Sequence, residues 1–271
     1  MALTKVIGNG LGAVTQDGAA TFNEGSADVD FRVESNGNAN ALIVDGGHST
    51  VGINTAAVSN RTLKIEGEGN TGAILSLNES TRGGLVEFSA GSGTELYIGS
   101  ELGILGSGNN NEFLIHTGVS ALKIDRTGAI SKPNQPAFSA GRSSTLSNFA
   151  INSQVVINLN AEIYDQNGDF SDPNFTAPVT GKYQLSAVWY LNALDISAAY
   201  YILRISTSNR NYDHVVDSSA RDEDETYSSY TLSVLADMDV NDTAQISLFQ
   251  QDGAAQTDVT GGTYFTGVLV C

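Results

Sequence analysis

The segment that decides the fold is GKYQLSAVWYL, residues 181–191, in which polar and apolar side chains alternate over 182–187 and hydrophobic ones continue to 191. A period of two is typical of a β-strand that is buried on one face only. Further strand-like segments occur in the same part of the chain and are separated or flanked by turns such as Asn167-Gly168, Asp252-Gly253 and Gly261-Gly262. These segments are 154–159, 199–206, 228–235, 244–250 and 264–270. Regularly spaced strands without helical periodicity predict an antiparallel sandwich or jelly roll.

The composition of the chain changes near residue 133. Of its 29 glycines, 22 precede this position, whereas only five of its 21 aromatic residues do. All four prolines lie at or after it, at Pro133, Pro136, Pro173 and Pro178. The run SKPNQP at 131–136 reads as an extended hinge, because proline restricts both itself and the residue before it. We therefore expect three parts: an attachment segment at 1–20, a glycine-rich region at 21–132 and a sandwich at 133–271.

Residues 21–132 read as short strands between glycine, asparagine and serine, and no stretch has helical periodicity. We expect this region to be nearly helix-free. An internal echo runs through it: FRVESNG at 31–37 and ALIVD at 41–45 recur as FLIHTG at 113–118 and ALKID at 121–125. Two loose copies indicate a repeating β architecture.

Such a region carries a high backbone entropy cost and few bulky side chains for a monomeric core. Oligomerisation solves this problem, because the valine, isoleucine and leucine rows of one chain can face those of its neighbours. The sequence therefore predicts an all-β protein in which an elongated, intertwined trimeric shaft precedes the C-terminal domain.

The second part of the chain resembles a known family. Its landmarks occur in order, and they are PAFSA at 136–140, Tyr164-Asp165, FTAPV at 175–179 followed by GKYQLSA at 181–187, and YFTGVLV at 264–270. They are similar to those of complement C1q-like globular heads. The resemblance implies a ten-stranded jelly roll that trimerises, stands on a stalk and binds ligands through its exposed surface, without catalysis. Two departures are Asn241-Asp242, where a Gly-Asp pair is common, and an apparent insertion at 169–174.

Animal members of this family usually carry a collagen stalk, but this chain has no Gly-X-Y period and little proline. Residues 28–130 instead resemble shaft modules of tailed-bacteriophage fibres, through the repeated FxVxSxG and ALxVD pattern and the closing Gly-Ile. This second resemblance implies a virion protein.

Charge and cysteine content exclude several classes of function. The 271 residues include 13 Lys and Arg against 30 Asp and Glu, a net charge of −17, so no basic stripe is available for nucleic acid. The single cysteine, Cys271, permits neither an intrachain disulfide nor a cysteine zinc site. The N-terminus lacks the apolar stretch of a signal peptide, and no segment is apolar enough to span a membrane. We expect assembly in a host cytoplasm and no membrane insertion.

No catalytic residue is predicted, although acidic pairs can always be chosen from 30 carboxylates. Tyr212, Asp213 and His214 lie in a polar stretch and are the predicted exposed contact residues, together with Arg221 of the charged run at 221–225. Asp222 and Asp224 in this run are candidate Ca²⁺ ligands, and a solvated loop is the alternative. No other cofactor is expected.

Two further patterns, a glycine motif and the histidines, give weaker evidence for a functional site. The GxGxxG at 67–72 precedes another strand-like segment, so it reads as a turn and not as a dinucleotide site. The histidines, His48, His116 and His214, lack metal-site spacing, although a trimer could bring three copies of one histidine together.

The preferred hypothesis is a homotrimeric fibre or spike of a phage virion. Its N-terminus would attach to other virion proteins, and its C-terminal domain would bind a host surface glycan or protein. Several weak contacts would act together through multivalency. The alternatives are a capsid decoration or head fibre without a receptor role, and a bacterial surface or spore-coat protein.

Overall fold

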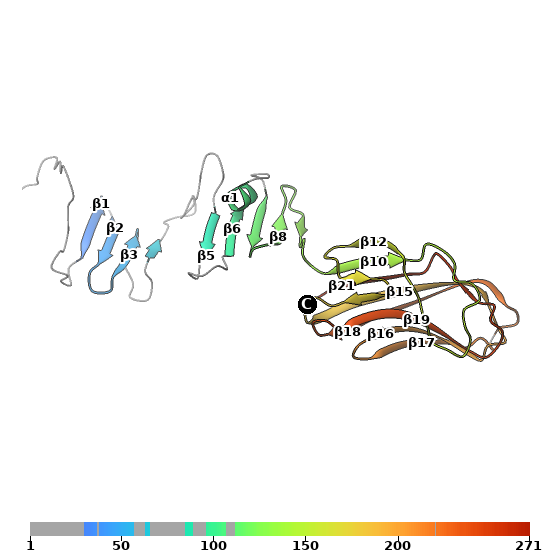
Figure 1. The fold of residues 1–271 in the computed structure, drawn as a ribbon. Helices are drawn as coiled ribbons and strands as arrows, with labels where there is room; N and C mark the ends of the chain where they lie inside the picture. The colour runs from blue at the N-terminus through green and yellow to red at the C-terminus, as the bar shows by residue number, and fades with distance from the viewer. Residues whose placement is uncertain are drawn as a thin grey trace, which may run out of the picture. The chain divides into compact units, whose positions relative to one another are not determined.

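The computed structural model describes residues 30–36, 38–56, 63–65, 85–88, 96–106, 112–219 and 221–271. The chain divides into two compact units, Met1–Asn78 and Glu79–Cys271 (Figure 1). The expected attachment segment, the strand expected at 73–77 and the GxGxxG lie outside the described residues. Within the described part of the chain, no helix has the length and apolarity to cross a membrane.

The first unit contains one four-stranded sheet in the order β1-β2-β3-β4. Its strands are β1 (Phe31–Ser35), β2 (Asn38–Asp45), β3 (Thr50–Ile53) and β4 (Leu63–Ile65). The first three form an antiparallel meander and β4 pairs in parallel with β3. The β2–β3 turn is held by the carboxylate of Asp45, which accepts the amide of His48 at 2.9 Å.

The second unit begins with a five-stranded sheet in the order β5-β6-β7-β8-β9. Its elements are β5 (Leu85–Phe88), β6 (Leu96–Ser100), the short helix α1 (Glu101–Leu105), β7 (Phe113–His116), β8 (Ser120–Ile124) and β9 (Ile130–Ser131). Asp125 builds the β8–β9 turn by accepting the amides of Thr127 and Ala129 at 2.8 and 2.9 Å. Gly128 supplies the positive φ of 87° that this turn requires.

The internal echo of the sequence corresponds to one repeated meander. Strands β1, β2 and β3 contain the first copy, and β7, β8 and β9 contain the second. The register is also shared: Phe31 pairs with Val44 in the first sheet as Phe113 pairs with Ile124 in the second. Residues at equivalent positions of the two copies therefore lie on the same face of their sheets.

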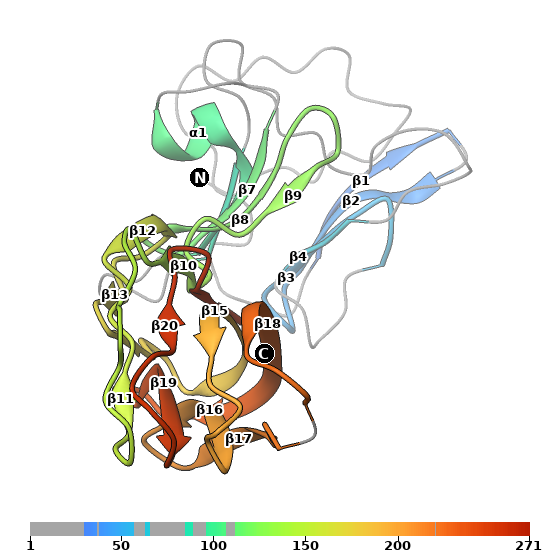
Figure 2. The same ribbon diagram turned by 90° about the vertical axis from the view of Figure 1, so that its right-hand side faces the viewer.

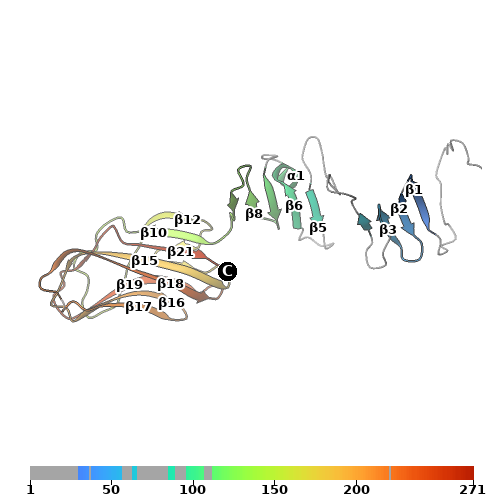
Figure 3. The ribbon, with the colours of Figure 1, turned by 180° about the vertical axis from the view of Figure 1, so that it is seen from behind.

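The remainder of the second unit is a sandwich of two antiparallel sheets. One has the order β12-β10-β21-β15-β18 and the other β13-β14-β19-β16-β17, and each carries one short strand off this path (Figures 1, 2 and 3). The strands are β10 (Ala137–Gly141), β11 (Val155–Val156), β12 (Ala161–Asp165), β13 (Phe170–Ser171), β14 (Asn174–Thr176), β15 (Gly181–Leu194), β16 (Tyr200–Thr207), β17 (Asn211–Val216), β18 (Glu225–Met238), β19 (Thr243–Gln251), β20 (Asp258–Val259) and β21 (Tyr264–Leu269).

The predicted all-β class and the jelly roll are confirmed, with the ten strands of the two main paths. The expectation of a nearly helix-free N-terminal region needs one addition, the five-residue helix α1. It is too short for helical periodicity to appear in the sequence, and packing on β6 and β7 holds it. The described N-terminal strands pair within one chain, and winding between three chains stays a prediction.

Three of the four sequence landmarks of the C-terminal domain meet in one aromatic cluster. The ring of Phe138 stacks on Phe175 with a centroid distance of 4.6 Å and meets Phe265 edge-on at 5.1 Å. Tyr183 joins at 5.4 Å from Phe175. These four residues come from β10, β14, β21 and β15, and all are buried. Landmarks that are far apart in the sequence therefore form the same part of the core.

Two details explain residue choices within these landmarks. A Cβ on Gly267 would lie 2.4 Å from the ring of Phe138 and 2.8 Å from Leu185, so the cluster leaves room only for glycine. Asn241, at the expected Gly-Asp position, has a positive φ of 72°. Asparagine tolerates this conformation better than most residues, which explains the departure from glycine.

Candidate self-association face and ligand-binding edge

The outward face of the sheet that contains β15, β18 and β21 carries no charged side chain over most of its length. Lys182 and Asp237 form an ion pair at one end and Glu225 lies at the other. Between them, every second residue points away from the core and is uncharged. These residues are Gln184, Ser186, Val188 and Tyr190 on β15, Ser229, Thr231, Ser233 and Leu235 on β18, and Tyr264, Thr266 and Val268 on β21.

Four polar side chains of this outward face, Gln184, Ser186, Ser233 and Thr266, form hydrogen bonds within the sheet. The hydroxyls of Ser186 and Ser233 lie 2.6 Å apart, and the side-chain amide of Gln184 donates to Ser233 at 2.8 Å. Thr266 donates to the carbonyl oxygen of Ser186 at 3.3 Å. A face whose polar groups already have partners loses little when water is removed. In a chain of charge −17, it is a surface on which two copies can meet without carboxylate repulsion.

Aromatic rings end this outward face on the side of Glu225. Tyr190 stacks on Tyr227 with a centroid distance of 5.9 Å, and 62% of Tyr227 is exposed. A Cβ on Gly262 would lie 2.4 Å from the ring of Tyr190, so this glycine lets the ring lie flat against the turn. This outward face was not predicted from the sequence. Its signal was the absence of charge at every polar position of 184–190 and 229–235.

The predicted contact residues Tyr212, Asp213 and His214 lie on β17, the last strand of the other sheet. The structure corrects their expected exposure, because Tyr212 and His214 point toward the sandwich interior and are half-buried. Tyr212 packs against the hydrophobic core. Asp213 points outward and receives two hydrogen bonds from Arg204, at 2.6 and 2.8 Å. This interaction raises the pKa of the Arg204 guanidinium.

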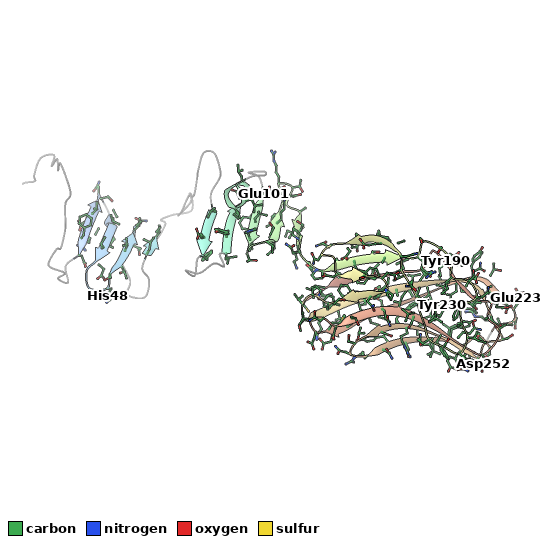
Figure 4. All side chains as sticks on the ribbon, viewed as in Figure 1. His48, Glu101, Tyr190, Glu223, Tyr230 and Asp252 are labelled. Atoms are coloured by element: carbon green, nitrogen blue, oxygen red, sulfur yellow. The ribbon has the colours of Figure 1, made fainter. Side chains whose placement is uncertain are left out.

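Arg221 lies in the connection between β17 and β18. Its guanidinium donates to the hydroxyl of Tyr230 at 2.7 Å and pairs with Glu225. The ring of Tyr230 lies 6.0 Å from the ring of His214 (Figure 4 labels Tyr230). The structure thus brings together His214 and Arg221 through a residue that had not been predicted as a site residue. We call Tyr212, His214, Arg221 and Tyr230 the edge cluster, because β17 and β18 are the last strands of their sheets.

The two calcium candidates do not form a cluster with other ligands. Asp224 accepts the amide of Ile196 at 3.0 Å and the side-chain amide of Gln256 at 2.8 Å, and these bonds lower its pKa. Asp222 is exposed. Across the described residues, no three His, Cys, Asp or Glu side chains gather as metal ligands. Asp224 holds two loops together at this end of the sandwich, and its role as a calcium ligand stays a prediction.

A buried aspartate forms hydrogen bonds to both of these loops. Asp195 is 2% exposed and accepts the amides of Ser197 and Ala254 at 2.8 and 2.5 Å. The hydroxyl of Tyr201 accepts the amide of Asp195 at 3.0 Å and lies 2.9 Å from the hydroxyl of Thr257. Figure 4 shows Glu223 and Asp252 at this end of the sandwich, away from Cys271. These loops are rigidly supported, so side chains on them have fixed positions.

No family model matches the sequence, and no curated protein is similar to it. Solved structures with some likeness include the globular domain of zebrafish complement 1qA, which is 18% identical, covers 51% of this chain and 98% of its own, and has a TM-score of 0.37. Murine APRIL is 8% identical over 51% of this chain and 100% of its own, with a TM-score of 0.36. The vertex protein P5 of PRD1 is 13% identical over 50% of this chain and 97% of its own, with a TM-score of 0.33. The fold assignment rests on the strand order and register described above.

Proposed function

We propose that this chain is a homotrimeric fibre or spike protein of a phage virion and that its C-terminal domain binds a receptor on the host-cell surface. The observation that carries the assembly is the uncharged outward face of β15, β18 and β21 in an acidic chain. Contact between copies through this face removes apolar and internally bonded polar groups from water and brings no carboxylates together.

The receptor role is supported by the edge cluster. It combines three half-buried rings with one guanidinium at an edge of the sandwich that no further strand covers among the described residues. Tyrosine and arginine on a rigid support are the residues that contribute most to protein and glycan contacts. Asp213, on the outer side of the same strand, adds a charged rim through its pair with Arg204. The ligand is a glycan or protein of the host surface.

The virion setting is supported by the resemblance of residues 28–130 to phage fibre shaft modules, and the trimer by the resemblance of residues 136–270 to C1q-like heads. Residues 1–20 would attach the fibre to other virion proteins. Several copies on one particle would turn weak single contacts into stable adhesion through effective concentration. A capsid decoration without a receptor role is the second candidate, since it needs the same self-association face.

Two measurements test this function. Full-length protein with Arg221→Ala is compared with Arg210→Ala, a matched change at an exposed arginine in the β16–β17 turn. Binding to host bacterial cells is expected to be saturable and to weaken about tenfold for Arg221→Ala alone, as for a moderate hot spot. Virions that lack residues 133–271 are expected to lose infectivity. Intact infectivity of such virions would reject the receptor role and support decoration.

A further inference from the structure

The residues that pair across the centre of the first sheet are apolar on one of its faces. The registers place these residues side by side, and they are Phe31 and Val33 on β1, Leu42 and Val44 on β2, Val51 and Ile53 on β3, and Leu63 and Ile65 on β4. Several are substantially exposed, with Val33 at 45% and Leu63 at 54%. We call this surface the open face of the first sheet. Exposed apolar surfaces of this kind mark sites of association.

The opposite face of the first sheet is different in composition and in burial. It carries Arg32 and Asp45, and its apolar and hydroxyl residues Ile43 and Thr50 are only 7% and 4% exposed. The charged residues Arg32 and Asp45 therefore lie on one face of the first sheet, and its apolar row lies on the other. A single sheet becomes stable in water only when a second layer covers its apolar face.

The sheet of β5 to β9 repeats this arrangement. Its open face consists of Val86 and Phe88, Leu96, Ile98 and Ser100, Phe113 and Ile115, Leu122 and Ile124, and Ile130. The opposite face contains Leu114, which is fully buried, and Lys123, which pairs with Glu101 of α1 at 3.2 Å and with Glu112. Helix α1 packs against β6 and β7. The charged groups and the helix again belong to one face and the apolar row to the other.

We propose that the open faces of the two N-terminal sheets pack against the same faces of other copies of this chain. This inference rests on the self-association in the proposed function and not on receptor binding. Backbone hydrogen bonds stay within each chain, so the copies meet through side chains at the spacing of stacked sheets, about 10 Å. With three copies, the three faces enclose a triangular apolar core, and no strand needs to be exchanged.

Three observations favour a copy of this chain over a foreign partner. The same apolar pattern occurs in both N-terminal sheets with the same register. A second copy of the chain carries the same two patterns and can therefore match both faces. Neither open face contains a charged residue, so like-charged chains of −17 can approach through them. A foreign partner selected by charge would need basic groups opposite carboxylates, and the open faces offer none.

The experiment measures the accessibility of single cysteines in the purified full-length protein, in which Cys271→Ser removes the native thiol. Val44→Cys and Val86→Cys lie on the open faces, and each wild-type side chain is 38% exposed in the single chain. Arg32→Cys and Glu87→Cys are the matched controls, because they lie on the opposite faces of neighbouring or identical strands and are exposed. A maleimide label is followed by mass spectrometry, and light scattering gives the mass of each sample.

The proposal predicts that the open-face thiols react about tenfold or more slowly than the controls, because labelling requires the interface to open. Purified protein contains only copies of itself, so protection that is lost when the sample is diluted to the monomer comes from self-association. Equal labelling of both faces in an oligomeric sample would overturn this inference and leave the self-association through the C-terminal domain standing. A monomeric mass would overturn both. Loss of receptor binding with protection retained would reject the receptor role alone.

Discussion

The C-terminal sandwich and the N-terminal sheets use the same strand chemistry but reach different degrees of closure. The sandwich buries Trp189, Tyr183 and Tyr201 completely between its two layers. Among the described residues of the N-terminal sheets, the buried hydrophobic residues are Ile43 and Leu114. Alternation places an apolar row on one face of the strands, and in the sandwich the second sheet covers this row. In the proposed self-association, other copies of the chain cover the apolar rows of the N-terminal sheets.

The largest expected effect comes from placing charge on the open faces. Val44→Asp together with Ile124→Asp would put an unpaired carboxylate into each proposed interface, at a cost of about 3–5 kcal/mol each. We expect the N-terminal unfolding transition, followed by circular dichroism, to move to much lower temperature or to disappear. Trp189 is the single tryptophan, so its fluorescence reports the sandwich separately, and that transition is expected to stay in place.

The matched controls for this change are Arg32→Asp and Ser131→Asp, which place the same carboxylates on the opposite faces. Both positions are exposed, and we expect small effects there. If the controls destabilise the N-terminal transition as much as the open-face variants do, the difference between the faces does not exist.

The next effect tests the closed core of the sandwich. Phe138→Ala removes the ring that contacts Phe170, Phe175 and Phe265 and leaves a cavity. A loss of about 3–5 kcal/mol in the free energy of unfolding is typical for such a change. Denaturant titration followed by Trp189 fluorescence measures it. The control Val215→Ala, at a side chain that is 61% exposed, is expected to change the stability by less than about 0.5 kcal/mol.

Sequence reasoning predicted the sandwich because strand-like segments with aromatic residues, such as 181–191, recur at regular spacing between turns. It also found the repeated meander, because Phe31 and Phe113 begin two copies of one pattern. It could not find α1, since five residues carry no helical period. The boundary between the two compact units lies between Asn78 and Glu79 in the sequence. The change in composition near residue 133 instead separates the five-stranded sheet from the sandwich, and both belong to the second unit.

The candidate site was only partly visible in the sequence. Polarity alone indicated that Tyr212 and His214 are exposed, but strand alternation with Val216 turns both toward the interior. Tyr230 was not predicted as a site residue, because its contact with His214 joins strands of different sheets. Such a contact depends on how the layers stack, and periodicity along one strand does not report it.

A smaller effect tests how the loops of the sandwich are held. Tyr201→Phe removes the hydroxyl that lies between the amide of Asp195 and the hydroxyl of Thr257 in a buried site. The amide of Asp195 keeps the Thr257 hydroxyl as a second acceptor at 3.2 Å, so the loss of the Tyr201 hydroxyl is expected to cost about 1 kcal/mol. The matched control is Tyr200→Phe on the same strand, whose hydroxyl makes one longer contact to Gln251 at 3.4 Å. A thermal melt of both variants, read by Trp189 fluorescence, measures the difference, and equal effects would contradict this role.

The smallest effect distinguishes the two regions by the sign of a pH dependence. Burial, with a contribution from the nearby Asp165 carboxylate, raises the pKa of Asp169 in the sandwich, and its buried Oδ2 has no hydrogen-bond partner. Bonds from Thr127 and the amide of Ala129 lower the pKa of Asp125 in the five-stranded sheet. The raised group favours folding when it is protonated, so its contribution is lost as pH rises from about 4 through the folded pKa. The lowered group contributes above about pH 4 and loses that contribution as pH falls through its folded pKa.

Asp169→Asn and Asp125→Asn should therefore act in opposite directions at neutral pH. Asp169→Asn is expected to raise the unfolding temperature of the sandwich by a few degrees, because the buried charge is removed, and this gain should vanish in acid. Asp125→Asn is expected to lower the N-terminal transition at neutral pH and to have no effect in acid, where the wild-type carboxyl is also protonated. Melting curves at several pH values, read by circular dichroism and by Trp189 fluorescence, give both signs in one series. Two shifts of the same sign would mean that the environments of these carboxyl groups in the two regions do not differ as described.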